Sequence, residues 1–135
     1  GKPEDILDAN RLVLEDLDRS IDGVVESGAE VRGEIDLAES ATIEDGAVVR
    51  GPVTIAEGST VADGTYIGPY TSVGPNSRIE GTHVENSVII GDSVITTNGR
   101  LIDSLIGRSA EVESAEGLLP EGRRLVVGEN SNLNL

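Results

Sequence analysis

The sequence predicts an all-β fold in which one chain winds as a single-stranded parallel β-helix of hexapeptide repeats, preceded by one α-helix. Aliphatic residues recur every six positions from residue 25 to residue 79, small residues precede them at a fixed offset, and the N-terminus carries a helical pattern. The 135 residues fit one domain. We divide it into a linker helix or cap (1–20), the β-helix (21–115), and a C-terminal loop with short strands (116–135).

The N-terminal segment, from residue 3 to about residue 19, is expected to be an amphipathic helix. Pro3 suits the first helical position, and Glu4 and Asp5 lie where the positive end of the helix dipole favours acidic side chains. The apolar stripe comprises Ile6, Ala9, Val13, Leu14 and Leu17. Since the first coil of a β-helix has an open edge, we expect this helix to cap it.

The repeat itself has a period of six, which is neither helical nor the period of two of a simple strand. Such spacing is typical of short strands joined by tight corners, with one aliphatic side chain per side pointing inward. The aliphatic positions are Val25, Val31, Leu37, Ile43, Val49, Ile55, Val61, Ile67, Val73 and Ile79. Two residues earlier stand Ala29, Ala41, Ala47, Val53, Ser59, Thr65, Thr71 and Ser77, with Ile35 as a bulkier exception.

Three sides make a coil of 18 residues, so equivalent positions of successive coils should stack in three internal ladders. We predict the ladders Val25, Ile43, Val61, Ile79; Val31, Val49, Ile67; and Leu37, Ile55, Val73. Backbone hydrogen bonds would join coils ~4.8 Å apart. Neighbouring coils would therefore stabilise one another, and a lone coil would not fold.

The regular step fails after Ile79, because Glu85 occupies the next position. The small-then-aliphatic pairs continue if some corners are one residue shorter: Thr82 with Val84, Ser87 with Ile89, Ser93 with Ile95, Gly99 with Leu101, Ser104 with Ile106, and Ala110 with Val112. This predicts sixteen rungs between Val25 and Val112. The alternative is that residues 80–112 form a separate irregular segment.

The segment RLVVGENSNLNL, after Pro120, contains two short alternating runs around a Gly-Glu-Asn turn. It is expected to fold over the open edge of the last coil or to add to a neighbouring subunit.

The composition limits the chemistry of the chain. It has no Cys, Met, Trp or Phe, so the core must consist of Val, Ile, Leu and Ala, and disulfides are excluded. No apolar run approaches the ~20 residues of a membrane-spanning helix, and no signal peptide is evident. We therefore expect a cytoplasmic protein without membrane partners. Because the chain begins with Gly-Lys-Pro and lacks Met, we expect it to be part of a longer protein.

The net charge is −15, from 25 acidic and 10 basic residues. The acidic residues are scattered along the chain, which favours a solvated surface over a docking site for a cationic partner. Many carboxylates with a single Lys suggest a halophilic source, since molar salt screens self-repulsion. Nucleic-acid binding is not expected, because phosphate recognition needs basic patches.

The handedness of the β-helix cannot be obtained from the period, and parallel crossovers are right-handed in about 98% of cases. Stretches such as IGPYTSVGPNSRIEG resemble the repeats of left-handed β-helices, the known exception. That resemblance implies a left-handed coil.

His83, the single histidine, is the sharpest candidate for chemistry. No Gly-rich phosphate loop or nucleophile elbow is present. Left-handed β-helix acyltransferases, which use coenzyme A, employ a His near a subunit interface as general base, and Thr96, Thr97 and Asn98 are the only nearby match to their further polar residues. The alternative is that His83 is a solvent-exposed residue at the first irregular corner. Glu44 with Asp45 and Glu30 with Glu34 are candidate cation ligands or ordinary surface carboxylates.

Three stretches together resemble long-form glucose-1-phosphate thymidylyltransferases and related sugar nucleotidylyltransferases. They are GKPEDILDANRLVLEDL, HVENSVIIGDSVI with LIDSLIGRSAEV, and LPEGRRLVVGENSNLNL. The resemblance covers nearly the whole chain. It implies a parent enzyme that joins dTTP or UTP to glucose 1-phosphate with Mg²⁺ and releases pyrophosphate.

In that family the catalytic domain precedes the segment seen here. The resemblance therefore assigns no catalytic, cofactor-binding or metal-binding residue to this chain. It implies a non-catalytic domain for oligomerisation and stability, with the catalytic domain and identical subunits as partners. A trimer is the first expectation and a dimer the second. A regulatory surface toward the catalytic domain is a third hypothesis, beside the scaffold and the acyltransferase.

Overall fold

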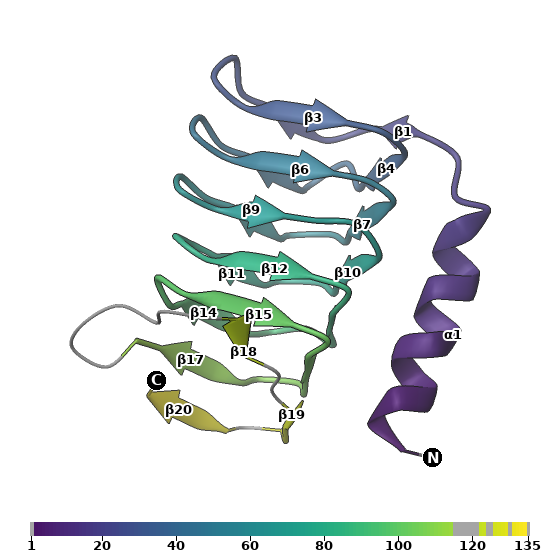
Figure 1. The fold of residues 1–135 in the computed structure, drawn as a ribbon. Helices are drawn as coiled ribbons and strands as arrows, with labels where there is room; N and C mark the ends of the chain where they lie inside the picture. The colour runs from purple at the N-terminus through teal and green to yellow at the C-terminus, as the bar shows by residue number, and fades with distance from the viewer. Residues whose placement is uncertain (1, 115–121, 124–125, 130, 135) are drawn as a thin grey trace.

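The computed structural model describes residues 2–114, 122–123, 126–129 and 131–134. The chain forms a three-sided parallel β-helix with the helix α1 (Pro3–Glu15) alongside it (Figure 1). The coils wind in a left-handed sense as they advance from the first coil to the last, which confirms the expected fold class (Figure 1).

Each side of the prism is one parallel sheet, and the described strands follow the order of the sides around each coil. Sheet A contains β1 (Ser20–Ile21), β4 (Ile35–Leu37), β7 (Val53–Ile55), β10 (Thr71–Val73), β13 (Val88–Ile89), β16 (Leu105–Ile106) and β19 (Val126–Val127). Sheet B contains β2 (Val24–Val25), β5 (Thr42–Ile43), β8 (Thr60–Val61), β11 (Arg78–Ile79), β14 (Val94–Thr96), β17 (Glu111–Glu113) and β20 (Asn132–Asn134). Sheet C contains β3 (Glu30–Arg32), β6 (Val48–Arg50), β9 (Tyr66–Ile67), β12 (His83–Glu85), β15 (Arg100–Ile102) and β18 (Gly122–Arg123).

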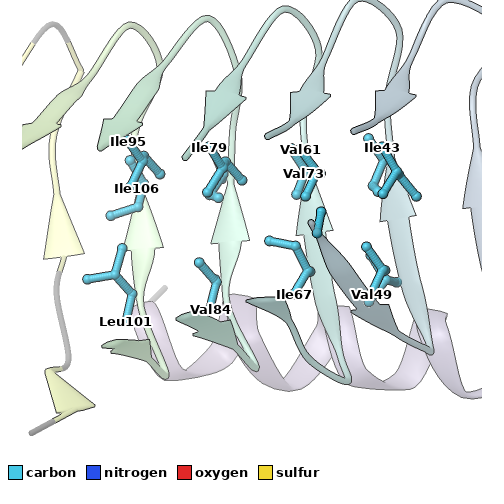
Figure 2. Close-up of a cluster of buried hydrophobic side chains, with 14 of the residues drawn as sticks. Ile43, Val49, Val61, Ile67, Val73, Ile79, Val84, Ile95, Leu101 and Ile106 are labelled. Carbon is cyan, nitrogen blue, oxygen red and sulfur yellow. The ribbon is translucent and has the colours of Figure 1, made fainter. Parts of the chain in front are cut away.

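The predicted internal ladders are confirmed. Ile43 pairs with Val61, and Val61 with Ile79, in successive strands of sheet B, and all three side chains are fully buried. Figure 2 shows these side chains meeting the ladders of the other two sheets in the interior. Each of the sixteen predicted rungs lies on its own strand, from β2 to β17. Val25, at 36% exposed, and Val31, which is partly buried, are the exceptions, because β2 and β3 are at the edges of their sheets.

The shorter corners after Ile79 are also present, so the irregular alternative for residues 80–112 is wrong. The chain turns at Gly81, Asn86 and Asp103 with φ of 69°, 46° and 52°. Glycine, Asn and Asp adopt this left-handed region more readily than other residues, so a single such residue can turn the chain from one side of the prism to the next. Five-residue steps therefore keep the aliphatic side chains pointing inward.

Buried serine hydroxyls at the small-residue positions link successive coils by hydrogen bonds. The backbone N–H of Ser77 donates to Ser59 Oγ at 3.0 Å, that of Ser93 donates to Ser77 Oγ at 3.2 Å, and that of Ala110 donates to Ser93 Oγ at 3.0 Å. Each hydroxyl thus accepts a backbone donor from the next coil. A buried donor left without a partner is costly, so these serines stabilise the stack beyond their small size.

The helix does not cap the first coil, and this expectation is wrong. It ends at Glu15 and runs along the corner between sheets C and A, beside several coils (Figure 1). Thirteen residues of helix span about 20 Å, roughly the height of four coils. The corner of the stack therefore buries more of the helix than one coil end would. The strands β1, β2 and β3 remain the edge strands of their sheets.

The buried face of the helix agrees with the predicted stripe at Leu14 but differs from it at Ile6 and Val13. Leu7 and Leu14 are 5% and 1% exposed, whereas Ile6 and Val13 are 43% and 72% exposed. The orientation follows from polar contacts with the corner, where Asn10 Nδ2 donates to the carbonyl of Tyr70 at 3.0 Å. The Ser72 hydroxyl donates to Asn10 Oδ1 at 2.5 Å, and the guanidinium of Arg11 lies 3.8 Å from the centroid of the Tyr70 ring.

The C-terminal segment continues the three sheets past residue 115. The strands β18, β19 and β20 pair in parallel with β15, β16 and β17. The last predicted edge is thus covered by a further coil of the same chain. Residues 115–121, which include Pro120, and residues 124, 125, 130 and 135 lie outside the described residues.

Candidate functional site

His83 lies within strand β12 on the outer surface of sheet C, and not at a corner as expected. Its ring centroid is 4.4 Å from that of Tyr66, on the strand above, with the ring planes tilted by 44°. Its Nε2 atom is 2.8 Å from Glu85 Oε1. Two residues apart on one strand, His83 and Glu85 point to the same side of the sheet, which brings them together.

A histidine hydrogen-bonded to a carboxylate is a possible general base, but the other predicted residues do not join it. Thr97 is fully buried, and its hydroxyl is 2.7 Å from Ser114 Oγ. Asn98 is exposed and donates its backbone N–H to Ser114 Oγ at 2.8 Å. His83 thus faces outward, while Thr97 belongs to the interior.

Three shallow hollows on the described surface are lined by residues other than His83. The one of about 440 Å³ lies between the C-terminal end of α1 and the corner, beside Leu17, Pro52 and Tyr70. A second, of about 280 Å³, lies at the other end of α1 beside Leu7. A third, of about 340 Å³, lies over Thr54 on sheet A. The first two follow from the side-on packing of the helix.

The carboxylates proposed as cation ligands serve the local structure instead of converging. Asp45 Oδ1 accepts the backbone N–H of Gly28 at 2.6 Å, and Glu44 Oε1 is 3.8 Å from the guanidinium of Arg78. Glu30 lies on β3, and Glu34 follows at the next corner. In the part of the chain that the structure describes, no three His, Asp or Glu side chains gather as a metal site.

The outer surface of sheet C carries a column of large side chains that sequence analysis missed. Val48 is in register with Tyr66, Tyr66 with His83, and His83 with Arg100. Arg32 and Arg50 stand side by side in a second column. Arg32 and Arg50 are 18 residues apart and Tyr66 and His83 are 17 apart, so the coil length was the signal that could have found both pairs.

Several known proteins resemble this chain in sequence. A family described as "GMPPB C-terminal domain" matches residues 49–134. The chain belongs to this family. The chain is 67% identical over all 135 residues to the low-salt glycan biosynthesis nucleotidyltransferase Agl11 of Haloferax volcanii. It is 38% and 34% identical to glucose-1-phosphate thymidylyltransferases of Streptomyces antibioticus and Streptomyces griseus. The resemblance seen in the sequence is confirmed.

The chain spans 38% of the length of the Haloferax relative and 37% of the two Streptomyces relatives. A solved structure, a putative acetyltransferase of Bacillus cereus, is 18% identical with a TM-score of 0.38, covering 80% of this chain and 76% of that chain. That likeness is too weak to bear on activity. No helix among the described residues is long and apolar enough to cross a membrane.

Proposed function

We propose that this chain is the non-catalytic oligomerisation and stability domain of a cytoplasmic sugar-1-phosphate nucleotidylyltransferase from a halophilic archaeon. The observation that carries the proposal is the match of its full length to little more than a third of three nucleotidyltransferases. The chain is a rod of stacked coils whose interior is aliphatic. The whole protein would join dTTP or UTP to glucose 1-phosphate, and Mg²⁺ would serve the catalytic domain.

The surface of the rod supports a role in assembly. Flat sides built of short strands are easily self-complementary, and most soluble oligomers close with a symmetry axis. We infer a trimer, with a dimer as the alternative. Partners are identical subunits and the catalytic domain, and neither nucleic acid nor a membrane is among them.

Sedimentation velocity of the 135-residue chain in about 1 M KCl tests this role, because at that ionic strength the Debye length is only ~3 Å and repulsion between acidic copies is screened. The expected result is a concentration-dependent trimer or dimer. Incubation with glucose 1-phosphate and dTTP should release no pyrophosphate. A monomer at every concentration, or turnover by the chain alone, would contradict the proposal.

A second candidate function is acyl transfer from coenzyme A with His83 as general base. It is favoured by the 2.8 Å contact between His83 Nε2 and Glu85, which would orient the imidazole. Calorimetry with acetyl-coenzyme A is the test. Binding that is lost in His83→Ala and kept in Arg78→Ala, on a different sheet, supports it. Absence of binding to the unmodified chain ends it.

A further inference from the structure

We propose that copies of this chain associate through the outer surface of sheet C, which packs against the acidic corner of the next copy. This inference rests on the proposed oligomerisation and identifies the surface that performs it. The surface, called here the arginine face, consists of Arg32, Val48, Arg50, Tyr66, His83 and Arg100. The acidic corner joins sheet B to sheet C and consists of Glu26, Glu44, Asp45 and Asp63.

The outer surface of sheet C differs in charge from the rest of the described surface. The chain has a net charge of −15, so two copies repel each other over most orientations. Three of its ten basic residues nevertheless point outward from sheet C, accompanied by Glu30 and Glu85. The outer surface of sheet B carries Arg78 together with Glu111 and Glu113. Sheet C is thus the side on which a second acidic copy meets the least repulsion.

Sheet A is a poorer candidate because α1 already packs against it. The helix contacts the outer position Ser72 through Asn10 and buries Leu7 and Leu14 beside the same corner. The helix thus occupies part of the outer surface of sheet A.

Arg32 and Arg50 of sheet C lack ion pairs of the kind that Arg78 and Arg108 make. Arg78 lies 3.2 Å from Glu80, and Arg108 lies 2.9 Å from Asp92. Among the described residues, Arg32 and Arg50 make no ion pair, although they are exposed and directly opposite each other in register. Like charges placed opposite each other on neighbouring strands are unfavourable. Carboxylates from another molecule would remove that repulsion.

The acidic corner offers such carboxylates. Glu26, Asp45 and Asp63 are exposed and occupy successive coils, with Asp45 bonded to the backbone of Gly28 in the coil above. They form a column with the same coil spacing as the arginines. Two surfaces with the same repeat can match over several coils. Contact between different surfaces of identical copies gives a ring when the rotation between copies closes.

An aromatic pair stands beside the arginine column. The ring centroids of Tyr66 and His83 are 4.4 Å apart with the planes tilted, and the His83 side chain is 33% exposed. The chain has only two tyrosines, and the other, Tyr70, is occupied by Arg11 of the helix. Tyrosine and arginine are enriched in protein interfaces, because a rigid ring buries area at a low entropic cost. This pair would be the apolar centre of the contact.

Charge reversals at matched positions test the proposal by sedimentation velocity in about 1 M KCl. Arg50→Glu is expected to raise the dissociation constant at least about tenfold. Arg108→Glu makes the same charge change at the corner between sheets A and B, away from both proposed surfaces, and should leave the constant unchanged. Equal effects of the two variants would overturn the proposal.

A second test makes the opposite charge change, from acidic to basic, at the acidic corner. Asp63→Lys lowers the net negative charge, so general repulsion alone predicts tighter association, whereas loss of a partner for arginine predicts weaker association. We expect weaker association. Tighter association would overturn the proposal. A second contradicting result would be that Val25→Asp, at the open first coil, dissociates the oligomer whereas Arg50→Glu does not. If the unmodified chain is a monomer, the proposed oligomerisation fails as well.

Discussion

Replacing one valine in the interior and one on the surface of the same sheet measures what the internal ladder contributes. Val61 is fully buried on β8, and Val94 on β14 is 43% exposed. Val61→Ala removes two methyl groups from a dry interior, at about 0.8 kcal/mol each. The unfilled cavity adds about 1 kcal/mol, which gives a loss of about 2.5 kcal/mol in the free energy of unfolding.

Val94→Ala removes the same atoms from a position half in contact with solvent. Its cost should stay below about 1 kcal/mol, because solvent fills the space and no cavity forms. Urea titrations of both variants in about 1 M KCl measure the difference. Equal losses would refute the assignment of one valine to the interior and the other to the surface.

Three further results are expected. Leu14→Ala should cost about 2–4 kcal/mol by thermal unfolding, because the side chain is 1% exposed, whereas Leu12→Ala, at 69% exposed, should cost under about 0.5 kcal/mol. Ser77→Ala should cost about 1–3 kcal/mol, because it leaves the N–H of Ser93 without its partner, and an unchanged midpoint in urea would contradict the hydroxyl column. Transfer from about 1 M to about 0.1 M salt should lower the melting temperature, because 25 acidic and 10 basic residues are then poorly screened; a melting temperature independent of salt would contradict a halophilic origin.

The repeat was predictable from sequence because every coil needs the same residue types at the same positions. One aliphatic residue per side and one small residue at each corner repeat wherever the coil repeats. The shorter corners were predictable too, since the small-then-aliphatic pair shifts by one residue with Asn86 and Asp103 at the turns. The last coil was not, because the long segment between β17 and β18 interrupts the period.

The place of the helix could not be read from its own residues. The apolar pattern pointed to Ile6 and Val13, yet Asn10 and Arg11 decide the orientation by contacting Tyr70. Tyr70 lies sixty residues away, and its position on the corner depends on the assembled coils. His83 was misplaced for a related reason, since the shorter corner at Gly81 moves it into a strand.

Spin labels test the stacking of the coils most directly, because the chain has no cysteine of its own. Thr42 and Glu111 point outward from sheet B four coils apart, and Val24 lies one coil further from Glu111. Electron–electron resonance on labelled cysteine pairs, diluted with unlabelled chain, should give separations of about 19 Å for 42–111 and about 24 Å for 24–111. Two distances that do not differ by about one coil spacing of ~4.8 Å would contradict the stacked β-helix.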